Sequence, residues 1–502
     1  MALTMQLNNP LEVRPALAAP FLAVVLLFSY LIWTATYNVF FHPLRKYPGP
    51  KLWSLSRIPL AREYISGYSI HRILDLHKKY GDIVRIAPNE LSYSHPNAWN
   101  DIYGHRKRGE AENGKDHLFY ERNRSNIIGC DRETHSRFRR ILSNGFSTQA
   151  MLAQESIIKI YVDQFIHRLH EKCQGGRNPL NIVSWFNYTT FDVIGDLAFG
   201  EPFGCLDNAD YHPWVAMIFL GIKAASIQTL TKHFWLLSGL LKFMIPKSLL
   251  RKRQQHLQMT HEKMAKRKAV ETSRPDFAES MLRKAGPEKL SDEELDGNAS
   301  ILIVAGSETT ATALSGAMYF LTTNPSVMAR LVEEVRTTFK EEVEINMIRV
   351  QGLSYLNAIL EETLRIYPPV PVGLPRKAPA NGAEVLGQYV PPGTLMSVWQ
   401  WPTYHNSKWF SLPNAFIPER WLGDPRFEND RMDALQPFST GPRNCIGKNL
   451  AYAEMRLMLC RTLWNFDVQI AEESHNWLDA QQSFLIWQKG PMDVYLTPRK
   501  IE

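Results

Sequence analysis

The sequence is poor in cysteine and contains no dense run of like charges and no long low-complexity linker. Five cysteines occur in 502 residues and lie far apart, at positions 130, 173, 205, 445 and 460. This spacing excludes a disulfide framework and a paired zinc site, and it fits a reducing compartment. Lys and Arg (57) exceed Asp and Glu (50) only slightly, so the charge argues against nucleic-acid binding and suits a membrane surface or an acidic partner.

Charge is also missing between Arg14 and Arg45, where residues 17–41 are almost wholly apolar. About 20 apolar residues cross a bilayer core, whereas the apolar part of a cleavable signal peptide is shorter. The flank after this segment is basic and contains Arg45, Lys46, Lys51 and Arg57. The sequence therefore predicts a transmembrane anchor with the rest of the chain in the cytosol. A buried core helix is the alternative.

These patterns divide the chain into four parts. Residues 1–14 are expected to form a short lumenal N-terminus, residues 15–41 the anchor, residues 42–50 a proline-rich hinge and residues 51–502 one large domain. The prolines of the hinge prevent a continuous helix. The hinge either sets the angle between anchor and domain or is an ordinary loop.

The large domain is predicted to be mostly α, in the α+β class with small sheets. Apolar residues recur with helical spacing in residues 157–170, 187–198, 300–322 and 327–339. Short β patterns lie near residues 83–86, 384–390, 395–399 and 484–496, with Pro- and Gly-containing turns between them.

The most informative segment is the loop of residues 438–448, which has Cys445 at its tip and leads into a predicted helix over residues 450–463. Gly441 and Gly447 permit tight turns and close approach, so that backbone N–H groups can point at the sulfur. Such hydrogen bonds stabilise a thiolate and tune a metal bound to it. Taken alone, an isolated cysteine of this kind is more often a buried structural residue.

The predicted helix over residues 300–322 contains the run Ala-Gly-Ser-Glu-Thr-Thr at positions 305–310. A glycine and two threonines are unfavourable in a helix interior, which suggests a kink or groove at Gly306. Glu308 and Thr309 could relay protons there. A solvent-facing polar turn is the alternative for this run.

Together with these segments, the loop resembles the haem-binding signature of the cytochrome P-450 superfamily, because Phe438, Gly441, Arg443, Cys445 and Gly447 stand at the positions that the signature requires. The resemblance extends over essentially the whole chain and implies the cytochrome P-450 fold, with residues 51–502 as a haem-thiolate catalytic domain. It implies haem b (iron protoporphyrin IX) with Cys445 as the axial iron ligand and Arg443 on a haem propionate. A thiolate ligand pushes electron density onto iron and favours O–O cleavage.

The resemblance assigns roles to three further groups of residues. Thr309 would hydrogen-bond the dioxygen at the haem, Glu308 would share in proton delivery, and Gly306 belongs to the same oxygen-activation motif. Glu362, Arg365 and Arg420 resemble the family's structural triad, with Arg420 expected to be bidentate to Glu362 and Arg365 held alongside. His135 stands where relatives usually carry tryptophan, so it could donate the hydrogen bond of the indole, and Arg139 and Arg376 resemble propionate ligands.

The implied function is a monooxygenase that inserts one oxygen atom of dioxygen into an apolar small molecule. The chain looks most like microsomal enzymes of fungal secondary metabolism such as the trichothecene hydroxylases, which implies hydroxylation, epoxidation or multistep oxidation of a terpenoid, polyketide or alkaloid. A haem-thiolate isomerase or dehydratase without a reductase and a non-catalytic haem-binding protein are the alternatives. The substrate pocket is expected to take its lining from residues 105–125, 304–309, 370–374 and 482–484.

The resemblance also implies partners and a location. Electrons would come from NADPH through NADPH-cytochrome P-450 reductase, with cytochrome b5 as a further candidate donor, and no nucleic acid is expected. The enzyme would be a single-pass protein of the endoplasmic reticulum membrane with its catalytic domain in the cytosol. The reductase is expected to meet basic residues on the cysteine side, namely Arg137, Arg140, Lys448 and Arg456.

Overall fold

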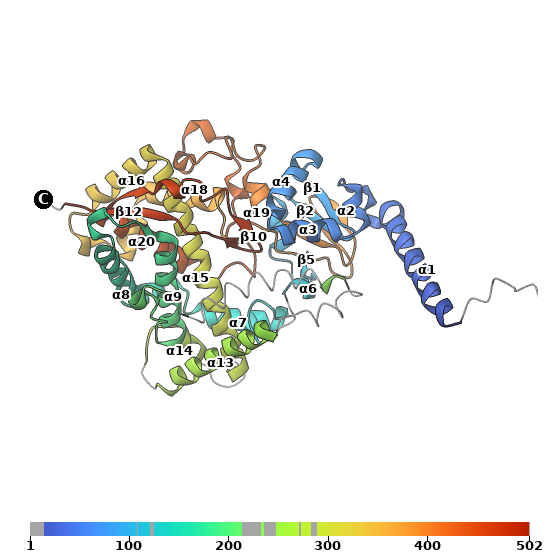
Figure 1. Cartoon of the computed structure of the whole chain (residues 1–502), viewed down its shortest axis with the longest axis horizontal. Coiled ribbons are helices and arrows are strands. Elements are labelled where there is room, and N and C mark those ends of the chain that lie inside the picture. The colour runs from blue at the N-terminus through green and yellow to red at the C-terminus, as the bar shows by residue number, and fades with distance from the viewer. Residues whose placement is uncertain are drawn as a thin grey trace, which may run out of the picture.

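The N-terminal helix stands apart from the rest of the protein. The structure, a computed structural model, describes residues 15–107, 109–120, 125–212, 232–234, 247–270, 273–282 and 289–500. Helix α1 (Pro15–Thr36) continues into a π turn at Tyr37–Phe41 and projects from one end of the body, while the C-terminus lies at the opposite end (Figure 1). The segment Ala19–Phe41 is long and apolar enough to span a membrane, and none of its most apolar window is buried. Helix α15 (Asp292–Thr323) passes the same test but is mostly buried, so it is a core helix.

The segment between α1 and the body is packed against the body. Leu44 and Tyr47 are buried, and the backbone N–H of Arg85 donates to the Pro48 carbonyl at 2.8 Å. The Arg85 guanidinium also donates to the carbonyl of Asn38 at 2.9 Å. These bonds hold the proline-rich segment on the first strand, so the chain leaves the anchor in a defined direction.

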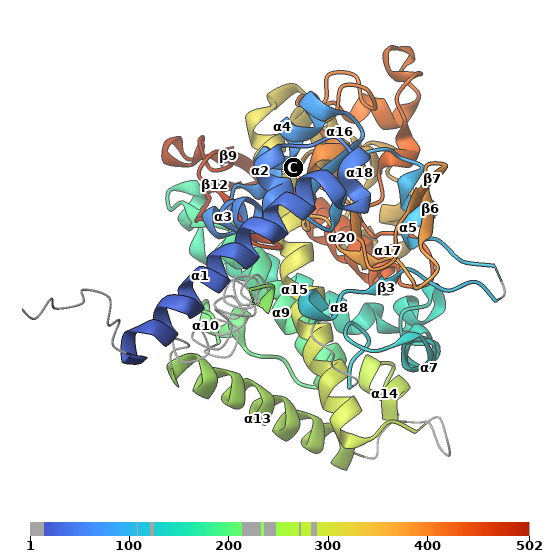
Figure 2. The same ribbon diagram turned by 90° about the vertical axis from the view of Figure 1, so that its right-hand side faces the viewer.

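Long helices form the core, and they contain the helices that the periodicity predicts. The main core helices are α8 (Thr148–Lys172), α9 (Ile182–Phe199), α15, α16 (Pro325–Thr338), α18 (Ser354–Ile366) and α20 (Lys448–Asn465). Shorter or peripheral helices are α2 (Lys51–Leu55), α3 (Ile58–Ser66), α4 (Ser69–Tyr80), α5 (Ala98–Tyr103), α6 (His117–Tyr120), α7 (Arg132–Ser143), α10 (Cys205–Asn208), α13 (Lys247–Ala269), α14 (Phe277–Leu282), α17 (Met347–Gln351) and α19 (Gln400–Tyr404). Figure 2 shows α13 along one edge of the body, below α9 and α15.

Local sequence signals set the ends of the two central helices. Ser291 caps α15 in a capping box with Glu294, and the acidic first turn of α15 complements the positive end of the helix dipole. Helix α9 starts at an Asn181 cap and ends at Gly200, whose φ of 76° lies in the left-handed region that favours glycine. The two helices pack against each other through the middle of the core.

The sheets are small, as predicted. A five-stranded sheet has the order β1 (Ile83–Ala87), β2 (Glu90–Tyr93), β8 (Leu395–Val398), β5 (Arg376–Lys377) and β3 (Gly114–Lys115). Only the β2–β8 pair of this sheet is parallel. A three-stranded sheet has the order β4 (Leu180–Asn181), β12 (Asp493–Pro498) and β9 (Phe466–Ile470), and two hairpins pair β6 (Ala383–Val385) with β7 (Gln388–Val390) and β10 (Gln482–Ser483) with β11 (Trp487–Gln488).

The β pattern expected near residues 484–496 is present, with the predicted Gly- and Pro-containing turn inside it. It is divided between β11 and β12, because the chain leaves the hairpin at Lys489 and joins the other sheet at Asp493. The mostly α fold with small sheets is confirmed.

Candidate functional site

The loop before α20 is held by a backbone hydrogen bond and by one close contact that only glycine allows. The N–H of Cys445 donates to the carbonyl of Phe438 at 2.8 Å. Gly441 has a φ of 76°, and a Cβ atom at this position would lie 1.9 Å from the carbonyl oxygen of Tyr103. The loop is therefore pressed against the end of α5, and this contact fixes the position of the cysteine.

Cys445 differs from the other cysteines in accessibility. All five lie in the part of the chain that the structure describes, and four are buried while Cys445 is exposed. The residue reaches accessible space, but the protein around its thiol raises the pKa of the Cys445 thiol by burial. The backbone N–H of Gly447 and the charges of Arg139 and Lys448 act in the opposite direction and favour the thiolate.

Basic side chains converge beside the loop around His135 of α7. Burial lowers the pKa of His135 to about 3, together with the charges of Arg443, Lys115, Arg139 and Arg376. The imidazole is therefore neutral at neutral pH and keeps one N–H donor. A cavity of about 140 Å³ at this place is lined by His135, Arg376 and Arg443 among other residues.

The arginines of this cluster differ in how completely their guanidinium groups are hydrogen-bonded. Arg139 donates to the backbone and side-chain oxygens of Asn444 at 2.5 and 2.7 Å, so it supports the cysteine loop directly. Arg443 pairs with Glu112 at 3.0 Å. Arg376 on β5 is buried, and its Nη1 atom has no hydrogen-bond partner. A buried guanidinium nitrogen without a partner indicates a place for an anionic group.

One face of the middle of α15 is accessible. Ala305 is exposed and Thr309 is half-buried, whereas Ser307, Glu308 and Thr310 are buried. The Thr309 hydroxyl donates to the carbonyl of Ala305 at 2.7 Å. Side chains four residues apart share a helix face, so Ala305 and Thr309 border the same space.

The glycine of this run has a packing role. Helix α15 is continuous through Gly306. The sequence predicts a kink or a groove at this position, and the exposed Ala305 beside it agrees with a groove. A Cβ atom at residue 306 would lie 3.0 Å from the side chain of Ile194 on α9. The glycine allows α9 and α15 to approach closely.

No local sequence pattern indicates the partner of Glu308. The Glu308 carboxylate forms a buried salt bridge with Lys489, and the Lys489 ammonium group also donates to the Thr312 hydroxyl at 2.6 Å. Burial raises the pKa of Glu308, and the charge and hydrogen bond of Lys489 oppose this shift.

The predicted triad assembles with a different pairing. Glu362 accepts two hydrogen bonds from Arg365, at 2.8 and 2.7 Å, so Arg365 is the bidentate partner. Arg420 lies 3.4 Å from Glu362 and forms its closer pair with Asp430. The expectation that Arg420 is bidentate to Glu362 is wrong, because the guanidinium group of Arg420 forms its closer ion pair with Asp430.

The remaining predicted surfaces are only partly as expected. Arg140 and Lys448 are exposed, but Arg137 pairs with Glu294 and Arg456 donates to Asn357 at 2.7 Å. Of the expected pocket lining, Val304, Val370 and Leu374 are half-buried and Phe484 is buried. Residues 108 and 121–124 of that lining lie outside the described residues.

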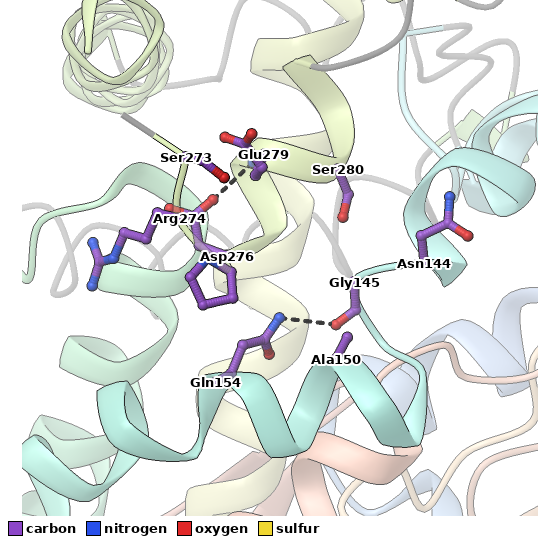
Figure 3. Close-up of a pocket in the computed structure, with 10 residues that line it drawn as sticks. Asn144, Gly145, Ala150, Gln154, Ser273, Arg274, Asp276, Glu279 and Ser280 are labelled. Atoms are coloured by element: carbon purple, nitrogen blue, oxygen red, sulfur yellow. Dashed lines mark hydrogen bonds between the residues drawn. The ribbon is translucent and has the colours of Figure 1, made fainter. Parts of the chain in front are cut away.

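A larger cavity lies elsewhere in the protein. Its volume is about 520 Å³, and Figure 3 shows Gln154 of α8 reaching across it to the backbone of Gly145, a bond of 3.1 Å. Its lining comprises Asn144, Gly145, Ala150, Gln154, Ser273, Arg274, Pro275, Asp276, Glu279 and Ser280. None of these residues belongs to the cysteine loop or to α15, so this cavity is separate from the candidate site.

The fold and the site together define a helix-rich protein in which an accessible cysteine lies beside a cluster of cations. The cytochrome P450 family model matches residues 48–495. The chain is 48% identical over 474 residues to the trichothecene C-15 hydroxylase of Fusarium sporotrichioides, covering 94% of this chain and 96% of that protein. It is 44% identical over 476 residues to the cytochrome P450 monooxygenase astJ of Aspergillus oryzae (94% and 95% covered) and 42% identical over 484 residues to the averantin hydroxylase of Dothistroma septosporum (94% and 91% covered).

The chain therefore belongs to the cytochrome P450 family and is an oxidoreductase of the monooxygenase type. Members of the family contain haem and receive electrons from a reductase. The residues here fit haem: Cys445 offers an accessible sulfur, and the unpartnered Nη1 atom of Arg376 lies in a cluster whose positive charge suits the propionates.

Proposed function

We propose that this protein inserts one oxygen atom of dioxygen into an apolar small molecule of fungal secondary metabolism, by hydroxylation, epoxidation or multistep oxidation. The names of the hydroxylases to which the chain is similar support this reaction type. The substrate would be a terpenoid, a polyketide or an alkaloid. The observation that carries the proposal is the accessible thiol of Cys445 in a glycine-packed loop beside the cation cluster.

The cofactor in this proposal is haem b, and the sulfur of Cys445 would hold its iron. When bound, thiolate-ligated haem supplies the activation of dioxygen and the transfer of one oxygen atom. Phe438, Gly441 and Gly447 shape the loop that presents the sulfur. The propionates would be held by Arg139, Arg376, Arg443 and the neutral imidazole of His135. Together these side chains offer charged and neutral hydrogen-bond donors to a carboxylate.

Proton delivery would fall to α15. The hydroxyl of Thr309 lies on the accessible face of the helix and donates its single proton to the Ala305 carbonyl, so its oxygen can accept a hydrogen bond from the substrate space. It can donate toward that space when it releases the carbonyl. Glu308 is the adjacent acid and could pass protons to this hydroxyl. Gly306 sets the spacing of α15 from α9 and thereby the position of both residues.

An apolar substrate agrees with the residues proposed to line the pocket. Val304, Val370 and Leu374 are half-buried aliphatic side chains, and Phe484 adds an aromatic ring. Such a lining binds by exclusion of water and selects by shape.

The proposed setting is the endoplasmic reticulum membrane, with one spanning helix and the catalytic domain in the cytosol. The apolar segment Ala19–Phe41 supports the anchor. Electrons would come from NADPH through NADPH-cytochrome P-450 reductase, with cytochrome b5 as a second donor. Exposed Arg140 and Lys448 offer positive charge for steering such a partner.

The direct test combines the full-length chain with its reductase, NADPH and isotopically labelled dioxygen, and screens terpenoid, polyketide and alkaloid candidates. We expect one labelled oxygen atom per oxidation step in the product, and no product without NADPH. Product formed without NADPH and reductase would indicate an isomerase or dehydratase. Haem binding without turnover of any candidate would favour a non-catalytic binding protein.

A further inference from the structure

The C-terminal hairpin contributes a charged side chain to the middle of the central helix. Lys489 follows β11 directly, and its side chain is 3% exposed although its neighbours Gln488 and Gly490 are exposed. The Lys489 ammonium group turns inward to the Glu308 carboxylate and donates to the Thr312 hydroxyl at 2.6 Å. The side chain thus links a surface turn to the acid next to Thr309.

The pair is fully desolvated, which makes its electrostatic interaction strong. The Glu308 side chain is also 3% exposed, and one of its oxygens, Oε2, is buried and has no hydrogen-bond partner. Removing charges from water is costly, so a pair of this kind contributes little net stability compared with apolar packing. The free oxygen remains as an acceptor or donor site on a carboxyl group whose other oxygen is held by Lys489.

The other groups near Glu308 are neutral, so Lys489 is the positive group that acts on its carboxylate. Two tyrosines lie near enough to interact electrostatically with the carboxylate: Tyr211, in the segment after α10, and Tyr367, at the end of α18. Burial raises the pKa of each phenol, and the negative charge of Glu308 acts in the same direction. Both tyrosines therefore remain neutral in the range in which an enzyme is assayed. Thr312 is also neutral, so Lys489 supplies the positive charge that acts on Glu308.

We propose that Lys489 is a positioning residue of the oxidation: its ammonium group holds the Glu308 carboxyl group so that this acid can pass protons toward Thr309. The proposal rests on the proposed monooxygenase function. Each proton that leaves Glu308 is replaced from solvent, so the step consumes no other reactant. A relay group must release and regain its proton, and it does so best when its pKa lies near the working pH.

The sign of the expected effect follows from the charges. Burial raises the pKa of Glu308, and Lys489 opposes that shift, so removing Lys489 raises this pKa further. At a given pH the protonated fraction of Glu308 then rises, so less carboxylate is present to take up the next proton. Raising the pH toward the new pKa restores the cycle.

The first experiment measures product formed per NADPH consumed, as a function of pH, in the reductase-supported holoenzyme. Lys489→Met is expected to lower this ratio several-fold at neutral pH, to raise peroxide, and to recover as the pH rises. The double variant Lys489→Met/Glu308→Gln should remain low at every pH. A wild-type ratio in Lys489→Met, a loss without recovery at high pH, or the same recovery in the double variant would overturn the proposal.

Lys408→Met is the matched control, because Lys408 is an exposed lysine paired with Asp82 at 2.5 Å and does not contact Glu308. This variant should keep the wild-type ratio and its pH dependence. An alkaline recovery in Lys408→Met as well would show that the effect is general and would overturn the assignment to Lys489.

The second experiment needs no turnover. The thermal unfolding midpoint of the holoenzyme is measured for Lys489→Met, Glu308→Gln and the double variant. Each single variant leaves one buried polar partner unpaired, so both midpoints should fall, and the double variant should regain part of the loss. Additive losses would show that the two side chains are not coupled. If the wild-type enzyme forms no NADPH-dependent product, the proposed function fails together with the positioning role, and additive or non-additive unfolding still decides the pairing.

Discussion

Replacing Glu362 tests the energetics of the core behind the cysteine loop. Its carboxylate is fully buried and accepts hydrogen bonds from Arg365, from the indole of Trp421 at 2.9 Å and from the backbone of Ile417 at 3.0 Å. Arg420 lies 3.4 Å away and is also fully buried. Glu362→Gln keeps the size of the side chain and removes the charge that two guanidinium groups share.

The magnitude follows from what each partner retains. Removing one member of a buried ion pair costs about 3–5 kcal/mol, because the other charge stays buried. Arg420 keeps Asp430, and Arg365 keeps the carbonyls of Tyr404, Pro413 and Ala415. These contacts favour the lower end, about 3 kcal/mol, which is a large part of the roughly 5–15 kcal/mol that stabilises a typical protein.

Urea denaturation of the purified holoenzyme, followed by the Soret band and by tryptophan fluorescence, measures the loss. The matched control is Glu419→Gln, next to Arg420 in the sequence, where Glu419 pairs with the exposed side chain of Arg330 at 2.8 Å. An exposed pair contributes at most about 1 kcal/mol. Equal losses in the two variants, or a loss below about 1 kcal/mol in Glu362→Gln, would refute the reasoning.

The same carboxylate predicts a pH dependence. Burial acts to raise the pKa of Glu362, but the charge and hydrogen bonds of Arg365, with Arg420, outweigh it and leave the pKa below the usual value of 4.5. A lowered folded-state pKa contributes stability above pH 4.5, and this stability is lost as the pH falls through the folded-state value. In Glu362→Gln this part of the acid loss should be missing.

Three further predictions concern the site and the anchor. Thr309→Ala should keep the haem but divert electrons from product to peroxide, and an unchanged product per NADPH would remove Thr309 from the proposed mechanism. Gly441→Ala should sharply reduce haem content, because its Cβ atom would lie 1.9 Å from the Tyr103 carbonyl; normal haem content measured by absorbance would contradict this. Deleting residues 1–41 should release the protein from membranes in a sedimentation assay while the haem spectrum persists, and continued sedimentation with membranes would show a second attachment.

The features that local sequence predicts well are those that depend on nearby residues. Helical periodicity located α8, α9, α15 and α16, because apolar residues recur in these segments with the spacing of a helix. The glycines of the cysteine loop indicated close packing, and the backbone of Tyr103 is the group that packs there. The family also follows from that loop and three other motifs.

The features that the sequence does not predict are pairings between distant residues. Lys489 meets Glu308 across 181 positions, and Glu112 meets Arg443 across 331, so no local pattern indicates either pair. Asp430 forms an ion pair with Arg420, and this carboxylate is not part of the triad motif. Gly306 predicted a kink or a groove, but no local pattern shows that Ile194 approaches it closely from another helix.

The spectrum of the reduced, carbon monoxide-bound enzyme tests the central proposal most directly, since that proposal makes the sulfur of Cys445 the iron ligand. The wild-type protein should show the red-shifted Soret band that a thiolate ligand gives, and Cys445→Ser should lose this band together with product formation. Cys460→Ser, at a buried cysteine on α20, is the control and should keep the band. A red-shifted band and full activity in Cys445→Ser would contradict the account.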